Sequence, residues 1–293
     1  MATGSVLLHA TRQLLSCFSI EIIPGDEHSV AVATQALPTR TETLITSLPR
    51  STFDAVVGTA RGLRRGGLVP VPHIAARNFR SEGELDQMLL RLAAEAGVDR
   101  VLLIGGDREK PAGPYADSLQ VLNSGLLQRH GIQKVYLPCY PEGHPRIAEE
   151  RLRRARKDKL AAAQNAGLGV AFISQFCFET APIARLAREL RTEGIETPLR
   201  IGIAGPVSSV VLLKYALLCG VGPSIRALRE RDGMAKTMIA GNTENLVTEI
   251  ALAQRNEPAL GIGGVHFFTF GAVGKTAAML ARIMQQGRTR KFC

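Results

Sequence analysis

The sequence contains no tryptophan, and only 5% of its residues are aromatic. Aromatic side chains are not interleaved with the basic ones, as a stacking platform for single-stranded nucleic acid would require. No apolar run approaches the roughly 18 residues that span a membrane. The mildly apolar first stretch lacks a basic leader and is interrupted by His9, Arg12 and Gln13. The sequence therefore predicts no membrane partner and no secretory signal, and residues 1–16 are expected to form an N-terminal helical extension.

Paired cysteine motifs are also missing. The five cysteines are odd in number and widely spaced, and no CxxC pair occurs. They are Cys17, Cys139, Cys177, Cys219 and Cys293. This pattern argues against a disulfide framework and against a structural zinc site, so no metal is expected. A reducing, cytoplasmic location fits, with most of the thiols serving as packing residues.

The common nucleotide-binding loops are absent too. GAVGKT, at 271–276, contains GKT but has only two residues between its glycines, whereas the phosphate-cradling loop needs four. No GxGxxG follows an expected strand. If a dinucleotide binds to this chain, another geometry must hold it.

Positive charge is in excess: the formal net charge is +10 and the sequence pI is near 9.8. Such a balance fits a nucleic acid, a phosphate-bearing cofactor or a polyanionic substrate, and it equally fits a solvated basic surface. The densest basic run is RLRRARKDK at 151–159. On a helix this run would either be solvated or supply cations to a diphosphate.

Eight short apolar runs alternate with helix-like stretches along the 293 residues. The expected strands are 18–23, 53–57, 69–74, 100–104, 133–138, 169–174, 199–204 and 264–269. Continuous apolar runs are typical of parallel strands with both faces covered. The pattern favours a (β/α)8 TIM barrel, forming a single domain over 1–293, with extra helices in 208–262 before the last strand.

Polar or glycine residues end nearly every expected strand, which is where barrel enzymes place their active sites. Glu21 is the most unusual of them, because it interrupts the apolar run FSIEII. Burying a charged carboxylate is costly, and burial usually raises its pKa. Each residue also has a structural interpretation: Glu21 as a paired carboxylate, His73 as a core histidine, and GGD (105–107) as a tight turn with a helix cap.

Seven segments in order carry a resemblance to a known family. They are FSIEIIP, VPHIAA, LLIGGD followed by YADSL, YLPCYPEGHP, ISQFCFE, IGIAGPVS and HFFTF. Together, from about Phe18 to Phe270, they resemble the methylenetetrahydrofolate reductase family, which are FAD-bound barrel enzymes. YPEGHP and SQFCFE after a GGD turn are the more specific motifs; the barrel pattern alone is not specific.

The resemblance implies a catalytic acid at Glu21, which would protonate N10 of the folate. It places Asp107 opposite the flavin and the pterin, as a second catalytic residue that also binds substrate. Gln175 matches the amide that reads the pterin edge. The implied cofactor is FAD, with NADH or NADPH as co-substrate and a small-molecule folate as substrate.

The resemblance also implies a set of FAD-binding positions: His73, Gly106, Asp107, Ala116, Tyr140 and His144, with Tyr115 packing under the cofactor. Lys159 is the first choice for the diphosphate, with Arg156 and Lys157 as alternatives. The flavin-contacting Thr expected after strand 2 falls at Val57, so Thr59 is expected to substitute for it. An aromatic residue expected after strand 7 falls at Val210, and an arginine expected after strand 8 falls at Ala272.

The sequence thus predicts an oxidoreductase that interconverts 5,10-methylenetetrahydrofolate and 5-methyltetrahydrofolate. The nicotinamide preference, the physiological direction and the oligomeric state, a homo-oligomer included, are left open. One alternative is a family relative without its own nicotinamide site, which exchanges electrons with a partner protein. A further alternative is a non-catalytic basic protein that binds nucleic acid; the main prediction includes no nucleic-acid partner.

Overall fold

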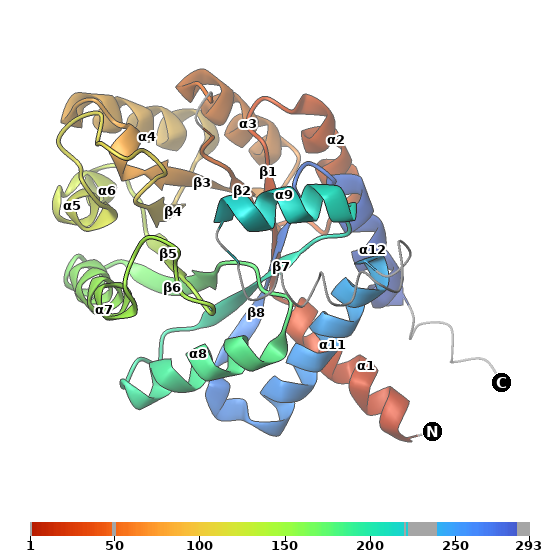
Figure 1. Ribbon diagram of the computed structural model, residues 1–293. Coiled ribbons are helices and arrows are strands. Elements are labelled where there is room, and N and C mark those ends of the chain that lie inside the picture. The colour runs from red at the N-terminus through yellow and green to blue at the C-terminus, as the bar shows by residue number, and fades with distance from the viewer. Residues whose placement is uncertain (1, 49–50, 220, 222–238, 286–293) are drawn as a thin grey trace. The chain divides into compact units, whose positions relative to one another are not determined.

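The eight strands of the computed structural model form a closed parallel barrel in the order β1 to β8, which confirms the (β/α)8 prediction (Figure 1). The structure describes residues 2–48, 51–219, 221 and 239–285. The strands are β1 (Phe18–Ile22), β2 (Glu42–Ile45), β3 (Val69–Ala75), β4 (Arg100–Ile104), β5 (Lys134–Cys139), β6 (Gly169–Ser174), β7 (Leu199–Ala204) and β8 (Ile262–Phe268).

Helices precede, connect and follow these strands. They are α1 (Ala2–Leu15), α2 (Glu27–Ala36), α3 (Phe53–Arg65), α4 (Glu82–Ala96), α5 (Ser118–Asn123), α6 (Leu126–Arg129), α7 (Glu149–Asn165), α8 (Thr180–Thr192), α9 (Ser209–Cys219), α11 (Ile239–Asn256) and α12 (Val273–Gln285), with the 3-10 turns η1 (Ala76–Asn78) and η2 (Pro258–Leu260). As expected, extra helices, α9 and α11, lie between β7 and β8. Among the described residues, no helix is both long and apolar enough to cross a membrane.

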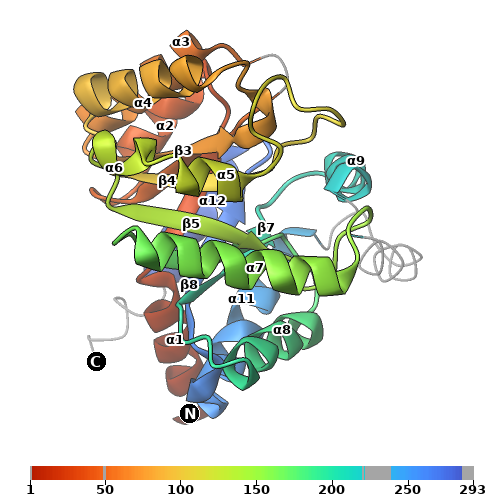
Figure 2. The ribbon, with the colours of Figure 1, turned by 90° about the vertical axis from the view of Figure 1, so that its left-hand side faces the viewer.

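The chain divides into two compact units. Unit 1 comprises Met1–Ile20, Tyr140–Ala148 and Ser174–Cys293, and unit 2 comprises Glu21–Cys139 and Glu149–Ile173. In unit 1, α1 packs along α11, and β8 pairs in parallel with both β7 and the start of β1 (Figure 1). In unit 2, α3 packs between α2 and α4, and α5 lies beside α7 (Figure 2).

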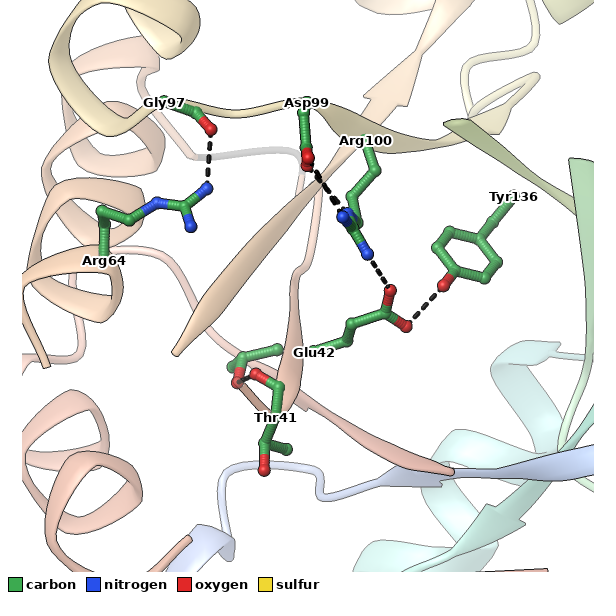
Figure 3. A network of polar contacts seen from close by, with 8 residues as sticks. Thr41, Glu42, Arg64, Gly97, Asp99, Arg100 and Tyr136 are labelled. Carbon is green, nitrogen blue, oxygen red and sulfur yellow. Dashed lines mark hydrogen bonds and ion pairs between the residues drawn. The ribbon is translucent and has the colours of Figure 1, made fainter. Parts of the chain in front are cut away.

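The interior of unit 2 contains an apolar cluster to which each strand from β2 to β6 contributes. Its members are Leu44, Val71, Leu102, Tyr136, Ala171 and Ile173, with Ile104 packed against it. Side chains two residues apart on a strand share a face. Glu42 and Arg100 therefore lie on this same face, at the N-terminal ends of β2 and β4, where Arg100 pairs with Glu42 and Asp99 (Figure 3).

The prediction of a second strand at 53–57 is wrong. Residues 53–57 are not a strand but the first turns of α3. Thr52 caps this helix by accepting a hydrogen bond from the Ala55 N–H, and its buried residues recur at helical spacing. The real second strand is the short run ETLI at 42–45, which pairs in register with β3.

Candidate functional site

Glu21 lies near the C-terminal end of β1 and is 8% exposed. Its neighbours Ile20 and Ile22 are completely buried or nearly so. The backbone N–H of Thr46, directly after β2, donates to the Ile22 carbonyl at 3.0 Å, which fixes this end of β1 against β2. A carboxyl group is thus held at the end of the strand where barrel enzymes carry their chemistry.

Thr59 does not lie at the end of a strand. It is buried in α3, where its hydroxyl accepts a 2.9 Å hydrogen bond from the Gly25 N–H in the loop after β1. The reason for assigning Thr59 to a flavin came from the wrong second strand and falls away with it. The position that does follow the second strand is Thr46, whose hydroxyl donates to the Ile22 carbonyl.

His73 lies within β3, opposite Leu102 of β4 and on the same strand face as Val71. Its Nε2 atom is buried and has no hydrogen-bond partner among the described residues. Desolvation lowers the pKa of His73 to about 4, so the ring is neutral at physiological pH. A neutral imidazole with a buried nitrogen is suited to one directional hydrogen bond with a ligand.

The loop after β4 carries four of the candidate residues. Gly106 has a φ of 91°, in the left-handed region that favours glycine. Asp107 and Ala116 are exposed, whereas Tyr115 is buried, and desolvation raises the pKa of its hydroxyl. Asp107 therefore presents its carboxylate to solvent, on a loop whose backbone needs the glycine before it.

The helix α7 brings two cationic side chains toward the interior of unit 2. Arg156 is buried and Lys159 is half-buried, whereas Lys157 on the same helix is exposed. Desolvation lowers the pKa of Lys159, and Asp117 at the start of α5 opposes that shift. Arg156 lies close enough to Cys139 to oppose a rise in the thiol's pKa, which desolvation nevertheless takes to about 12. A buried cationic face is unusual for a helix and needs an anionic neighbour.

In unit 1, Tyr140 and His144 lie together in the loop after β5. Their ring centroids are 5.2 Å apart and the rings are nearly perpendicular. His144 Nδ1 accepts a hydrogen bond from the Arg146 N–H, and the Gly143 N–H donates to the Tyr140 carbonyl. The loop is thus a compact turn that fixes both aromatic rings.

Gln175 follows β6 in the same unit. Its side-chain carbonyl oxygen accepts a 3.0 Å hydrogen bond from the Phe176 N–H. The preceding Ser174 hydroxyl donates to the Gln175 carbonyl and accepts from the Gly202 N–H of β7. These bonds tie the loop after β6 to β7, and Gln175 itself is half-buried.

Unit 1 also contains an aromatic cluster that was not predicted from the sequence, made by Phe176, Phe178, Phe268, Phe270 and Tyr215. Tyr215 of α9 stacks on Phe270 at 4.5 Å between centroids, and Phe270 has a positive φ of 49°. The alternation of phenylalanines in FCF and FFTF is the signal that could have revealed the cluster. Non-glycine residues at positive φ are uncommon, and such strain concentrates at functional sites.

The chain is similar in fold to solved structures. One is a protein from Clostridium thermocellum described as binding two copies of 5-methyl-5,6,7,8-tetrahydrofolic acid. It matches with a TM-score of 0.61 and 10% identity, over 97% of this chain and 99% of that one. Another is a lyase/mutase candidate from Burkholderia cenocepacia J2315, with a TM-score of 0.50 and 14% identity, over 98% of this chain and 87% of that one. No protein-family model matches the sequence.

Proposed function

We propose that the protein is a flavin-dependent oxidoreductase that interconverts 5,10-methylenetetrahydrofolate and 5-methyltetrahydrofolate. The observation that carries the proposal is the burial of Glu21 at the C-terminal end of β1. The motif resemblance supports the folate as substrate. The Clostridium protein of similar fold, which binds a methylated tetrahydrofolate, adds support for that ligand class.

The residues of unit 2 fit FAD. His73 offers a buried nitrogen without a protein partner among the described residues, as a flavin contact requires. An alanine Cβ at Gly105 would meet no atom within 4 Å, so there is open space beside the turn before Asp107. Lys159 is a half-buried cation on α7 that could bind a diphosphate, and the buried Arg156 lies on the same helix. In unit 1, Tyr140 and His144 are assigned to the same cofactor by the resemblance alone.

The proposed chemistry assigns a separate task to each side chain. A bound flavin would supply hydride transfer, taken from NAD(P)H or from the methyl group of the folate. Glu21 would deliver the proton that N10 needs when the ring bridging N5 and N10 opens, and would take it back in the reverse direction. Asp107 would bind and orient the pterin, and the amide of Gln175 would read its edge with a donor and an acceptor.

A second candidate is a relative that takes electrons from a partner protein in place of a nicotinamide. Val210 of α9, where the resemblance expects an aromatic residue, is 78% exposed and offers no flat ring for stacking. Under this candidate, 5-methyltetrahydrofolate would bleach the flavin, whereas NADH and NADPH would not. Under the first candidate, at least one nicotinamide would also bleach it.

Glu21→Gln tests the proposed role of the carboxyl. Glutamine keeps the size of the side chain but cannot donate a carboxyl proton. We expect folate turnover to fall by about 10²-fold or more, as for loss of a general acid, while FAD binding stays unchanged. Turnover equal to that of the wild type would refute the role of Glu21.

A further inference from the structure

The turn η1, directly after β3, is hydrogen-bonded to the loop that follows β4. The Arg77 N–H donates to the Gly105 carbonyl at 3.0 Å, and the Ala112 N–H donates to the Arg77 carbonyl at 2.9 Å. These two backbone bonds join Arg77 to both sides of Asp107. The loop 105–116 therefore folds around Arg77 of η1.

The side chain of Arg77 adds two more connections. Its Nε donates to the Ala116 carbonyl at 2.7 Å, and its Nη1 donates to the Arg108 carbonyl at 3.2 Å. Both acceptors are backbone atoms, so the contacts constrain the path of the loop and not a side chain. A planar guanidinium can hold two carbonyls in different directions, which a lysine ammonium cannot do in one fixed geometry.

Close packing reinforces these bonds. A Cβ at Gly113 would collide with the backbone carbonyl of Arg80, so the loop lies directly on the chain that leaves η1. Asn78, the last residue of the turn, donates to Ser47 in the segment after β2 at 3.2 Å. The turn η1 thus connects the segment after β2 to the loop after β4.

We infer that Arg77 is a positioning residue, which holds the loop 105–116 in the conformation that presents Gly106, Asp107, Tyr115 and Ala116 to the ligand. The inference rests on the proposed function for the identity of that ligand, FAD. The ordering of the loop by Arg77 does not depend on it. Loops without such ties open locally at little cost in free energy, and preorganisation removes that cost from binding.

Hydrogen–deuterium exchange of the amides in 105–117 of the full-length apoprotein tests the ordering. Arg77→Gln removes the guanidinium, and Arg77→Lys keeps the positive charge but not the planar arrangement of donors. Arg80→Gln is the matched control, because within the described part of the chain the Arg80 guanidinium makes no hydrogen bond or ion pair with the loop, which meets only its backbone. We expect exchange in the loop to speed up by about tenfold in both Arg77 variants, from the loss of hydrogen bonds made by a charged donor, and to stay unchanged in Arg80→Gln.

Affinity for FAD, measured on the same proteins, tests the consequence. We expect the Kd to rise by about tenfold in both Arg77 variants, with the apoprotein Tm within about 1 °C of the wild type. Gly113→Ala should weaken FAD binding similarly, because it displaces the loop while leaving the guanidinium intact. Rescue of loop protection and affinity by Arg77→Lys would overturn the inference, as would faster exchange spread evenly over unit 2.

The two proposals fail in different ways. If the wild-type protein takes up no FAD, the proposed function is wrong, yet exchange in the loop still decides the role of Arg77. If the wild type binds FAD and Arg77→Gln leaves loop exchange unchanged, the positioning role is wrong and the proposed function stands.

Discussion

The guanidinium of Arg100 on β4 reaches past β3 to the carboxylate of Glu42 on β2, with 2.6 Å between Nη1 and Oε1 (Figure 3). The other Glu42 oxygen accepts a hydrogen bond from the Tyr136 hydroxyl of β5. Arg100 also pairs with Asp99 at 2.8 Å, and hydrogen bonding to Arg100 lowers the pKa of Asp99. This network at the N-terminal ends therefore joins three strands of unit 2, on the strand face that also carries His73 nearer the C-terminal end of β3.

Glu42→Leu should lower the stability of the fold. The Glu42 side chain is 11% exposed, and its loss removes an acceptor of the Tyr136 hydroxyl and a carboxylate that pairs with Arg100. We expect a loss of about 1–3 kcal/mol in the free energy of unfolding, as for removing one partner of a partly buried pair. Chemical denaturation measures it, and Arg154→Gln, which breaks a 3.8 Å pair on a largely exposed side chain, should leave the midpoint unchanged. An unchanged midpoint for Glu42→Leu would contradict this account.

Thr59→Val should destabilise the protein without weakening a ligand. The hydroxyl is buried and accepts from the Gly25 N–H, so valine leaves that donor without its partner. We expect a cost of about 1–2 kcal/mol in denaturation. Affinity for FAD should match that of the wild type. A selective loss of FAD binding would restore the original expectation for this residue.

The error at residues 53–57 shows what sequence patterns resolve and what they do not. The run FDAVV is apolar enough for a strand, but its cap at Thr52 and the buried Val56, Ala60 and Leu63 are helical signals. The true strand ETLI is short and half polar, because its N-terminal Glu42 faces an arginine and not apolar side chains. Strand propensity alone could not identify β2, because the arginine that pairs with Glu42 is Arg100, 58 positions away in the sequence.

The other elements were easier to predict because each carries its own signal. Ser81 caps α4 by accepting from the Glu84 N–H at 3.2 Å, and a Ser followed three residues later by Glu is a capping-box signal in the sequence itself. Seven of the eight expected strands overlap observed ones, since fully covered strands are nearly continuous apolar runs. The role of Arg77 could not be predicted, because its partners are backbone carbonyls, which no residue type in the sequence reveals.

Lys159→Met should weaken FAD binding, if the cofactor binds as proposed. Desolvation already lowers the pKa of this half-buried amine, and an anionic diphosphate would compensate its charge. We expect the Kd to rise by about 10-fold to 100-fold, corresponding to loss of a charge-assisted hydrogen bond. Lys157→Met is the matched control on the exposed face of α7 and should leave the Kd unchanged. Equal effects of the two variants would argue for long-range attraction by the basic surface and against a specific contact.

His73 should make the apoprotein less stable as the pH falls. Its pKa is about 4 in the folded state against an ordinary value of 6.5, so below pH 6.5 the unfolded chain binds the proton first. The free energy of unfolding therefore keeps its full value, as far as His73 is concerned, above pH 6.5 and decreases as the pH falls toward 4. The total decrease is at most about 3 kcal/mol, at 1.36 kcal/mol per pH unit. Urea denaturation across this range should show a flatter profile for His73→Gln. The exposed control His9→Gln should keep the wild-type profile, and identical profiles for all three proteins would refute the prediction.

The visible absorption spectrum of the purified wild-type protein, reconstituted with FAD and titrated anaerobically with 5-methyltetrahydrofolate, tests the proposed function most directly. The account predicts stoichiometric FAD binding and bleaching of the oxidised flavin band by the folate, with the band restored by 5,10-methylenetetrahydrofolate. A protein that binds no FAD, or whose bound flavin keeps its full absorbance in excess 5-methyltetrahydrofolate, would contradict it.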